Sequence, residues 1–288
     1  MKKVAAVVVL YNPEDTVIHN VNTYVDQVDK LYVIDNSDKI NEHLIEQIKR
    51  INRVEYTWNK KNIGIAAALN LGARKAILDQ YDYLLTMDQD SEAPPLMVSN
   101  LLDCFLVDAK VASVAPLLLN PVGGHTKINH TEPCEQVLTV WTSGNLLDLT
   151  IFRTTDGFRN DFFIDYVDHE FCLRLIRLGF KIHLCNCVTV KHHLGNIKEI
   201  NLFFRKIYPT HHSPLRLYYR TRNRFYVRKI YKHSVPEFFK GESLQFWKSY
   251  LKVVLFEKDR IKKIKYIING YRDFKRNIFG KFEDIHGK

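Results

Sequence analysis

The sequence of 288 residues contains no run of eighteen or more apolar residues, the length that a membrane-spanning helix needs. Its apolar N-terminal stretch Val4–Leu10 leads directly into Tyr11, Asn12 and Pro13, without the small-residue cleavage site of a secretory signal peptide. We therefore expect a first buried strand and no transmembrane segment. Internal repeats and low-complexity segments are also absent, and 46% apolar with 26% charged residues is typical of a soluble globular protein.

Cysteine is scarce, and its spacing does not match that of a metal site. The five cysteines form no C-x-x-C pair and are odd in number, which argues against a zinc site and against a disulfide framework. They are Cys104, Cys134, Cys172, Cys185 and Cys187. The simplest interpretation is a protein of the reducing cytoplasm.

Acidic and basic residues are unevenly distributed along the chain. Residues 1–180 contain 17 Lys and Arg against 24 Asp and Glu, a net charge of −7, whereas residues 181–288 contain 25 against 8, a net charge of +17. The basic part suits nucleic acid, anionic lipid or phosphate-bearing substrates, and charge alone does not choose among them.

Short β-branched runs alternate with helical patterns in the first part of the chain. The expected strands are Val4–Leu10, Leu31–Asp35, Val54–Trp58, Tyr83–Met87 and Val111–Ala115. A helix is expected after the first strand, with Val17, Val21, Val25 and Val28 on one face, and another over Gly64–Leu78. This alternation predicts an α/β fold with a mainly parallel sheet flanked by helices, in which ligands bind at the carboxyl ends of the strands.

A change of composition predicts a domain boundary near residue 200. Residues 1–200 are expected to form the α/β domain, with one half at about 1–115 and the other at about 116–200. Residues 201–288 are basic and aromatic, and their apolar residues recur at helical spacing, so they are expected to form a helical C-terminal region.

Polar residues follow three of the expected strands. Tyr11 and Asn12 follow the first, Asp35 and Asn36 close the second, and the triplet Asp88-Gln89-Asp90 follows the fourth. Two carboxylates so close together repel unless a cation joins them, and Mg²⁺ or Mn²⁺ would also neutralise a diphosphate. The triplet alone is weak evidence, because two acids in a loop are usually solvated.

A series of motifs in fixed order resembles glycosyltransferase family 2. In the first half they are Val7–Asn12, Val33–Ser37, Asn62–Gly64 with Asn70, and Asp88–Asp90; in the second half they are Thr142–Asn145, Phe163–Arg174 with Gly179, and His192–Gly195. The segment Ser213–Asn223 is similar to the tail of the rhamnosyltransferase branch of that family. The resemblance covers residues 3–195. It implies a GT-A fold with a C-terminal helical appendage and an inverting, metal-dependent transfer of a sugar.

The resemblance implies a set of residues that bind the nucleotide-sugar donor. They are Tyr11, Asn12, Asp35, Asn62, Gly64, Asn70 and Asp88. Asp35 would accept a hydrogen bond from the imide N–H of uracil or thymine, and its alternative role is to cap the turn after its strand. The alternative for Gly64 is a hinge between a loop and a helix.

The resemblance also implies a divalent cation, Mg²⁺ or Mn²⁺. Asp88 would reach the ribose or the donor sugar, and Asp90 would bind the metal. His192 matches a histidine that completes the metal site in some members of the family. The neighbouring His193 is a second candidate, and an ordinary polar loop residue is the alternative.

Asp168 matches the aspartate of the family's acidic motif, six residues before Arg174. It would be the general base that removes the proton of the acceptor hydroxyl. The family commonly has Glu-Asp at this place, whereas this chain has Val167-Asp168, so Asp165 is a competing candidate. Asp168 as a helix N-cap is the alternative, and Glu170 with Arg174 would be a helix-surface pair.

The acceptor side is implied by a second group of residues. Ser143 and Gly144 resemble the acceptor loop, Asp165 is a further candidate for binding the acceptor, and Trp141 would stack on a sugar ring. For Trp141 the alternative is a buried core tryptophan.

Arginine and aromatic residues interleave in the C-terminal region, a mixture that also occurs on nucleic-acid-binding surfaces. The arginines are Arg216, Arg220, Arg222, Arg224 and Arg228, and the aromatic residues are Tyr218, Tyr219, Phe225 and Tyr226. Because no RNA- or DNA-binding motif accompanies them, we expect an anionic membrane surface instead. The protein would then be cytoplasmic and peripherally associated with the inner face of the cell membrane. Packing between tail helices or a homodimer contact is the alternative.

The resemblance of the tail favours L-rhamnose as the transferred sugar, with dTDP-L-rhamnose as its donor. The acceptor would be a lipid-linked saccharide in the synthesis of a bacterial surface polysaccharide. A UDP-hexose or UDP-galactofuranose donor is the alternative, because an imide contact does not separate uracil from thymine. A non-catalytic nucleotide- or carbohydrate-binding protein is a third hypothesis, against which the joint presence of Asp88, Asp90 and Asp168 argues.

Overall fold

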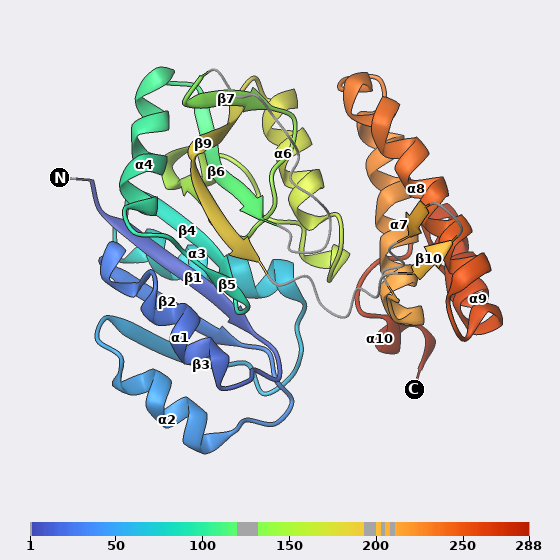
Figure 1. The fold of residues 1–288 in the computed structure, drawn as a ribbon, viewed down its shortest axis with the longest axis horizontal. Helices are drawn as coiled ribbons and strands as arrows, with labels where there is room; N and C mark the ends of the chain where they lie inside the picture. The colour runs from blue at the N-terminus through green and yellow to red at the C-terminus, as the bar shows by residue number, and fades with distance from the viewer. Residues whose placement is uncertain (1, 120–131, 193–199, 203–204, 208–210, 288) are drawn as a thin grey trace. The chain divides into compact units, whose positions relative to one another are not determined.

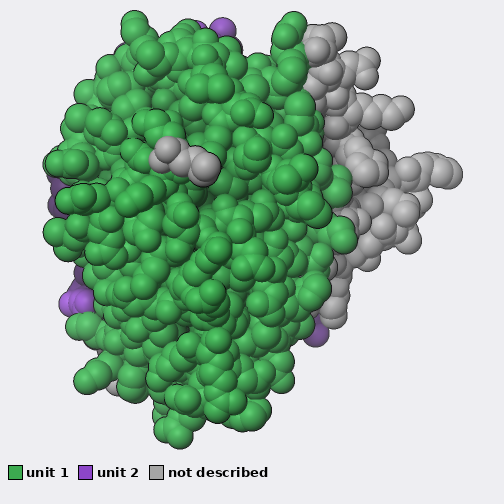
Figure 2. Space-filling model, turned by 90° about the vertical axis from the view of Figure 1, so that its left-hand side faces the viewer, with its two compact units in different colours: residues 1–160, 167–193 green, residues 161–166, 194–288 purple. Residues whose placement is uncertain are grey.

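The computed structural model describes residues 2–119, 132–192, 200–202, 205–207 and 211–287, with the backbone alone at 192, 200–202 and 205–207. The chain forms two compact units, which Figure 2 colours separately. Residues 1–160 and 167–193 form the α/β unit, and residues 161–166 and 194–288 form the C-terminal unit.

A nine-stranded sheet forms the centre of the α/β unit, in the order β3-β2-β1-β4-β8-β6-β9-β5, with β7 paired to β9. The strands are β1 Val4–Leu10, β2 Lys30–Asp35, β3 Val54–Trp58, β4 Tyr83–Asp88, β5 Ser91–Glu92, β6 Val111–Leu119, β7 Cys134–Val137, β8 Asn145–Asp148 and β9 Lys181–His192. Strands β1 to β4 pair in parallel, as expected from the sequence. Strand β8 is antiparallel to β4 and β6, so the second half of the sheet is mixed.

Helices cover both faces of this sheet (Figure 1). They are α1 Thr16–Asn22, α2 Glu42–Arg50, α3 Ile65–Leu78, α4 Met97–Asp103, α5 Leu149–Phe152 and α6 Val167–Arg177. Val7 of β1 faces α3 so closely that a Cβ on Gly72 would lie 2.3 Å from its Cγ2. Its neighbours Ala6 and Val8 instead join the core cluster that contains Val17 and Met97. Because successive side chains of a strand point to opposite faces, β1 is buried on both.

The first predicted helix is shorter than its apolar pattern suggested. Helix α1 ends at Asn22, and Val25 begins a short 3₁₀ helix over Val25–Gln27. Val28 follows that turn in an extended conformation. All four valines of the pattern are nonetheless buried, because the irregular turn still carries them against the same face of the sheet.

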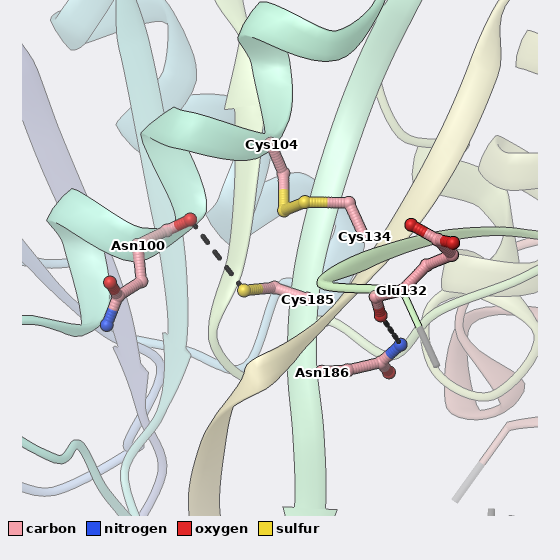
Figure 3. Close-up of a disulfide and its surroundings, with 6 residues drawn as sticks. All are labelled: Asn100, Cys104, Glu132, Cys134, Cys185 and Asn186. Carbon is pink, nitrogen blue, oxygen red and sulfur yellow. Dashed lines mark hydrogen bonds between the residues drawn. A yellow bond between two sulfur atoms is a disulfide. The ribbon is translucent and has the colours of Figure 1, made fainter. Parts of the chain in front are cut away.

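The sequence argument against disulfides is wrong, because Cys104 and Cys134 form a disulfide with their Cα atoms 5.8 Å apart (Figure 3). Cys104 follows α4 directly, and Cys134 begins β7, where it lies opposite Cys185 of β9. The thiol of Cys185 in turn contacts the backbone carbonyl of Asn100 in α4 (3.7 Å). Packing of α4 on β9 and pairing of β7 with β9 thus bring the two cysteines together, which spacing in the sequence could not reveal.

The C-terminal unit consists mainly of helices: α7 Pro214–Tyr231, α8 Pro236–Phe256, α9 Arg260–Arg276 and α10 Phe282–His286. The antiparallel strands β10 Ile200–Leu202 and β11 Arg205–Ile207 precede them. Helix α7 begins with Ser213 as a cap that accepts the backbone N–H of Arg216, and Pro214 follows at the first helical position. Within the described parts of the chain, no helix is both long and apolar enough to span a bilayer.

Helix α7 is largely interior, which changes the interpretation of its arginines. Arg222 and Arg224 are buried, as are Tyr218 and Tyr219. The Arg224 guanidinium lies 3.9 Å from the ring centroid of Phe246 in α8. At these positions the interleaved arginine and aromatic residues pack between helices, so they are not part of a nucleic-acid or membrane surface.

Candidate active site

The polar strand ends that the sequence indicated meet at one edge of the sheet. Strand β1 lies between β2 and β4, so the chain order reverses there, and such a reversal is where ligands bind in open α/β sheets. In the ladder, Leu10 pairs with Asp35, and Val9 pairs with Asp88. The structure therefore brings the residues after β1, β2 and β4 to the same edge.

Gln89, for which the sequence indicated no role, joins two of these strand ends. The backbone N–H of Tyr11 donates to Oε1 of Gln89 (2.9 Å), and Nε2 of Gln89 donates to the Tyr11 carbonyl (3.3 Å). Nδ2 of Asn20 donates to the Gln89 carbonyl (2.8 Å). The turn between Asp88 and Asp90 is thereby tied to the end of β1.

Asp35 is completely buried, and both of its carboxylate oxygens accept hydrogen bonds. Oδ1 accepts the backbone N–H of Ser37 (2.8 Å), and Oδ2 accepts the hydroxyl of Tyr56 (2.8 Å). Burial and this carboxylate raise the pKa of Tyr56. The contact with Ser37 matches the turn-capping role, and each carboxylate oxygen still has a second acceptor position.

Ser37 links the ends of the first three strands. Its hydroxyl accepts the backbone N–H of Asn12 (2.8 Å), and its carbonyl accepts Nε1–H of Trp58 in the last position of β3 (2.8 Å). Asn12 has a left-handed φ of 45°, which a short polar side chain tolerates. The side chain of Tyr11 remains 46% exposed beside this network, where a planar ligand could contact its ring.

Gly64 and Asn62 form the start of α3. Gly64 is the N-cap of this helix and has φ of 86°, a conformation that favours glycine. It therefore acts as the hinge between the loop and the helix, the alternative role considered from the sequence. Its N–H donates to Oδ1 of Asn62 (2.9 Å), and its carbonyl accepts Nδ2 of Asn36 (3.2 Å). Asn36 follows β2, so this loop is fastened to the same sheet edge.

Asn70 is buried in α3 and fixes a different segment. Its Nδ2 donates to the Phe158 carbonyl (2.6 Å) and to Oδ1 of Asn160 (2.7 Å), while its Oδ1 accepts the Phe158 N–H (2.8 Å). These contacts use both ends of the amide. Asn70 thus holds residues 158–160 against α3.

The metal-binding candidates lie on adjacent parts of the sheet. Asp88 is the last residue of β4, Asp90 lies in the following turn, and both are half-buried. Ser91, next to Asp90, pairs with the backbone of His192. Among the described side chains no group of three or more ligating residues occurs. The side chain of His192 and the whole of His193 lie outside the described part of the structure. Carboxylate oxygens and an imidazole nitrogen are donors that suit Mg²⁺ or Mn²⁺.

The predicted acceptor loop lies beside the triplet. The hydroxyl of Ser143 donates to the hydroxyl of Ser91 (2.7 Å), one residue after Asp90. Gly144 has φ of 76°, and a Cβ there would lie 2.6 Å from the ring of Pro116, so only glycine fits without a shift. Trp141 is 45% exposed, and the alternative of a buried core tryptophan is therefore wrong.

Asp168 is the second residue of α6, so it lies within the first turn and not at the N-cap position. Its side chain is half-buried, and Oδ1 accepts the backbone N–H of His169 (2.8 Å). A negative charge in the first turn is stabilised by the helix dipole. Glu170 and Arg174 form a buried ion pair (3.0 Å), which corrects their assignment to the helix surface.

The competing candidate Asp165 belongs to the C-terminal unit. Both of its carboxylate oxygens accept Nε–H of Arg216 at 3.3 Å. It lies just before α6 in a left-handed conformation with φ of 61°. The two acids thus differ in environment: Asp165 has a cationic partner, whereas Asp168 accepts a backbone N–H.

The comparison with protein families defines the class of this protein. The family described as "Glycosyl transferase family 2" matches residues 5–169, which is more than half of the chain. The chain belongs to this family of glycosyltransferases, as its sequence motifs indicated.

A curated relative adds detail. The protein is 28% identical over 249 residues to the "dTDP-rhamnosyl transferase RfbF" of Shigella flexneri, a match that covers 80% of this chain and 81% of the relative. The similarity to the rhamnosyltransferase branch is therefore confirmed. The shared 80% exceeds the α/β unit, so it extends into the C-terminal unit.

Solved structures confirm the GT-A fold. One is that of GalNAc-T7 with UDP, GalNAc and Mn²⁺, with a TM-score of 0.61 and 15% identity, covering 96% of this chain. This chain spans only 56% of the length of that structure. Another is that of S. aureus TarS 1–349, with a TM-score of 0.54 and 11% identity, covering 99% of this chain and 74% of TarS.

Proposed function

We propose that this glycosyltransferase transfers L-rhamnose from dTDP-L-rhamnose to a saccharide acceptor with inversion at the anomeric carbon. One structural observation carries the proposal: the hydrogen bonds between Gln89 and Tyr11 hold the Asp88–Asp90 turn beside the end of β1, where a nucleotide diphosphate would lie. The relation to a dTDP-rhamnosyl transferase supports the choice of sugar.

The donor would lie along the carboxyl ends of β1, β2 and β4. The exposed ring of Tyr11 can stack on the base. Asp35 would accept the imide N–H through a remaining acceptor position, which requires the residues that cover its buried carboxylate to move. Asp88 would contact the ribose or the sugar. Asn12 would lie beside the base with Tyr11. Asn62 and Gly64 would shape the wall beside the diphosphate and the base, with Asn70 fixing the loop behind it.

A divalent cation fits the residues after β4. Asp90 and His192 would hold Mg²⁺ or Mn²⁺, which when bound supplies positive charge to the departing diphosphate. The backbone pairing of Ser91 with His192 supports this set, because Asp90 directly precedes Ser91 in the chain.

Asp168 would act on the acceptor. Its carboxylate takes the proton of the acceptor hydroxyl while that oxygen attacks the anomeric carbon, and the bond from this carbon to the diphosphate oxygen breaks. The products are the rhamnosylated acceptor and dTDP, and the configuration inverts because attack and departure are in line. Trp141, Ser143 and Gly144 would line the acceptor side.

A lipid-linked acceptor at an anionic membrane surface is supported by two exposed apolar stripes of the C-terminal unit. On α8 the stripe is Leu244, Trp247, Leu251 and Val254, and on α9 it is Ile261, Ile264, Ile268 and Tyr271. Both follow the same helical spacing, and exposed lysines such as Lys248 and Lys262 lie beside them. Apolar side chains flanked by lysines suit the interface of a membrane with anionic lipids.

The test is a transfer assay with a panel of donors. We expect release of dTDP from dTDP-L-rhamnose, with little turnover of UDP-glucose, UDP-galactose or UDP-galactofuranose. EDTA should abolish turnover, and Mn²⁺ should restore it. Mn²⁺ should also raise the affinity for dTDP measured by calorimetry, and Asp90→Ala should lose this increase. Its control, Asp26→Ala, changes an exposed acid near the start of β2. If the protein turns over a UDP-sugar faster than dTDP-L-rhamnose, that UDP-sugar is the donor and the proposal of rhamnose is wrong. If it binds donors but turns over none of them, it is a non-catalytic protein.

A further inference from the structure

Residues 161–166 lead into α6 but group with the C-terminal unit. Three of them have left-handed φ angles: Phe163 (67°), Asp165 (61°) and Tyr166 (62°). Residues other than glycine seldom adopt such angles, and they persist where surrounding contacts impose them. The contacts that do so here come from helices α7 and α8.

Asn223 of α7 binds the backbone of this segment. Its side-chain amide donates to the carbonyls of Phe162 (3.0 Å), Ile164 (2.9 Å) and Asp165 (2.9 Å). Nε–H of Arg222 donates to Oδ1 of Asn223 (3.0 Å), which orients the amide with its NH₂ group toward these carbonyls. Both side chains are completely buried, so water does not compete for the bonds.

Arg222 binds the beginning of the segment. Its Nη2 donates to the carbonyls of Asp161 (3.0 Å) and Phe162 (3.1 Å), and its Nη1 donates to the carbonyl of Gly280 (2.8 Å). Hydrogen bonds from a charged donor are stronger than neutral ones, and a buried guanidinium needs them. The segment is thus held by its backbone from its first residue to Asp165.

Side chains of the segment are held as well. Asp165 pairs with Arg216, and the hydroxyl of Tyr166 donates to Oε1 of Glu242 in α8 (2.6 Å). Glu242 is itself fixed by Arg224, whose Nε and Nη2 donate to its two oxygens at 2.9 and 3.0 Å. The last two residues before α6 are therefore anchored to two helices of the C-terminal unit.

We propose that Arg222 and Asn223 are positioning residues for sugar transfer, because they fix the segment that leads into the helix carrying Asp168. The inference rests on the proposed function, in which Asp168 is the base. Asp168 follows Asp165 by three residues, and three residues of chain extend at most about 11 Å. Fixing the Asp165 carbonyl therefore restricts the positions open to the Asp168 carboxylate.

The experiment compares three variants of the full chain. Asn223→Leu keeps a similar volume but removes the donors to three carbonyls. Arg216→Met removes the partner of Asp165 at a side chain that is 48% exposed, so it tests the same segment if Asn223→Leu does not fold. Arg228→Gln is the matched control, because Arg228 lies on the same helix and donates to Ser243 of α8. Hydrogen exchange of the amides of 161–168, kcat with dTDP-L-rhamnose and the Kd of dTDP are measured for each.

We expect exchange at 161–168 to accelerate about tenfold or more in Asn223→Leu and less in Arg216→Met. The kcat should fall 10- to 100-fold in Asn223→Leu, with the Kd of dTDP unchanged, because dTDP binds at the sheet edge. Arg228→Gln should resemble the wild type. Unchanged exchange, or faster exchange with full kcat, would overturn the proposal. If the wild type transfers no sugar, the proposed function fails, and the exchange rates alone then decide whether Arg222 and Asn223 hold the segment.

Discussion

Tyr11 and Gln89 exchange two hydrogen bonds in opposite directions, one from the Tyr11 N–H at 2.9 Å and one to the Tyr11 carbonyl at 3.3 Å. Through them, the residue between the two acids of the triplet joins the ends of β1 and β4. The expected base-binding and metal-binding parts of the site are thus joined by one side chain, in addition to the pairing of β1 with β4. Gln89 is a structural member of the site even though it is not itself charged.

Replacing Gln89 with Leu should weaken donor binding while leaving the fold intact. The variant loses two neutral hydrogen bonds, each with a net value of about 0.5–1.5 kcal/mol. If that loss falls on the donor-binding conformation, the Kd of dTDP in the presence of Mn²⁺ should rise about 5- to 150-fold by calorimetry. Gln47→Leu, at an exposed position of α2, is the control. An unchanged Kd in Gln89→Leu would show that the turn keeps its place without these bonds.

The base is tested by exchanging each candidate acid for its amide. Asp168→Asn keeps the shape of the side chain and removes most of its basicity, so kcat should fall about 10²- to 10⁴-fold while the Kd of dTDP persists. Asp165→Asn, which loses a paired charge, should lose less activity. Near-full transfer by Asp168→Asn with an inactive Asp165→Asn would reverse the assignment. Loss of dTDP affinity in both would place these acids in the donor site.

Much of the sheet edge could be predicted from local sequence. Buried β-branched runs define where β1, β2 and β4 end, and parallel pairing brings their polar ends to one edge, so Asp35 and Asp88 were found without a structure. The role of Gln89 could not be found in this way. It depends on which strands are neighbours, and a glutamine inside a turn carries no pattern of its own.

Features that depend on distant packing were also missed. The partners of Asn70 lie 88 and 90 residues away in the sequence. The buried guanidinium of Arg222 looked like part of a basic surface, because alternation of arginine and tyrosine is the same in a surface and in a packed helix. Only the burial of α7 distinguishes the two.

The disulfide between Cys104 and Cys134 should stabilise the protein when it is formed. It closes a loop of about 30 residues, for which loop entropy gives about 3–4 kcal/mol. We expect reduction, or Cys134→Ser, to lower the free energy of unfolding in urea by about this amount. Cys187→Ser, which replaces an exposed free thiol, is the control. Equal urea midpoints with and without reductant would mean that the bond does not form in solution.

Membrane association should depend on the exposed stripe of α8. Trp247→Ser with Leu251→Ser removes two large apolar side chains that are more than half exposed, so folding should be unaffected. We expect binding to anionic liposomes to fall at least tenfold in sedimentation. A control pair, Leu78→Ser with Leu106→Ser, removes exposed leucines of the α/β unit. Equal binding by both double variants and the wild type would rule out this stripe as the contact.

The acid sensitivity of the C-terminal unit should depend partly on His212. Burial, together with the positive charges of Arg216, Arg220 and Lys263, lowers the pKa of His212 to about 3. In the unfolded chain a histidine has a pKa of about 6.5, so between pH 6.5 and 3 the unfolded state binds a proton that the folded state does not. Stability contributed by neutral His212 is therefore present above pH 6.5 and is lost as the pH falls below it.

The expected slope follows from the same linkage. One such histidine lowers the free energy of unfolding by at most about 1.4 kcal/mol per pH unit below 6.5, and by less here, because the side chain is partly exposed and solvent screens its neighbours. His212→Gln, which stays neutral, should unfold in urea with a shallower dependence on pH between 6 and 4. His43→Gln, at an exposed position of α2, should keep the slope of the wild type. If the His212 variant keeps that slope as well, acid destabilisation comes from other groups, and the cationic surroundings of His212 do not control it.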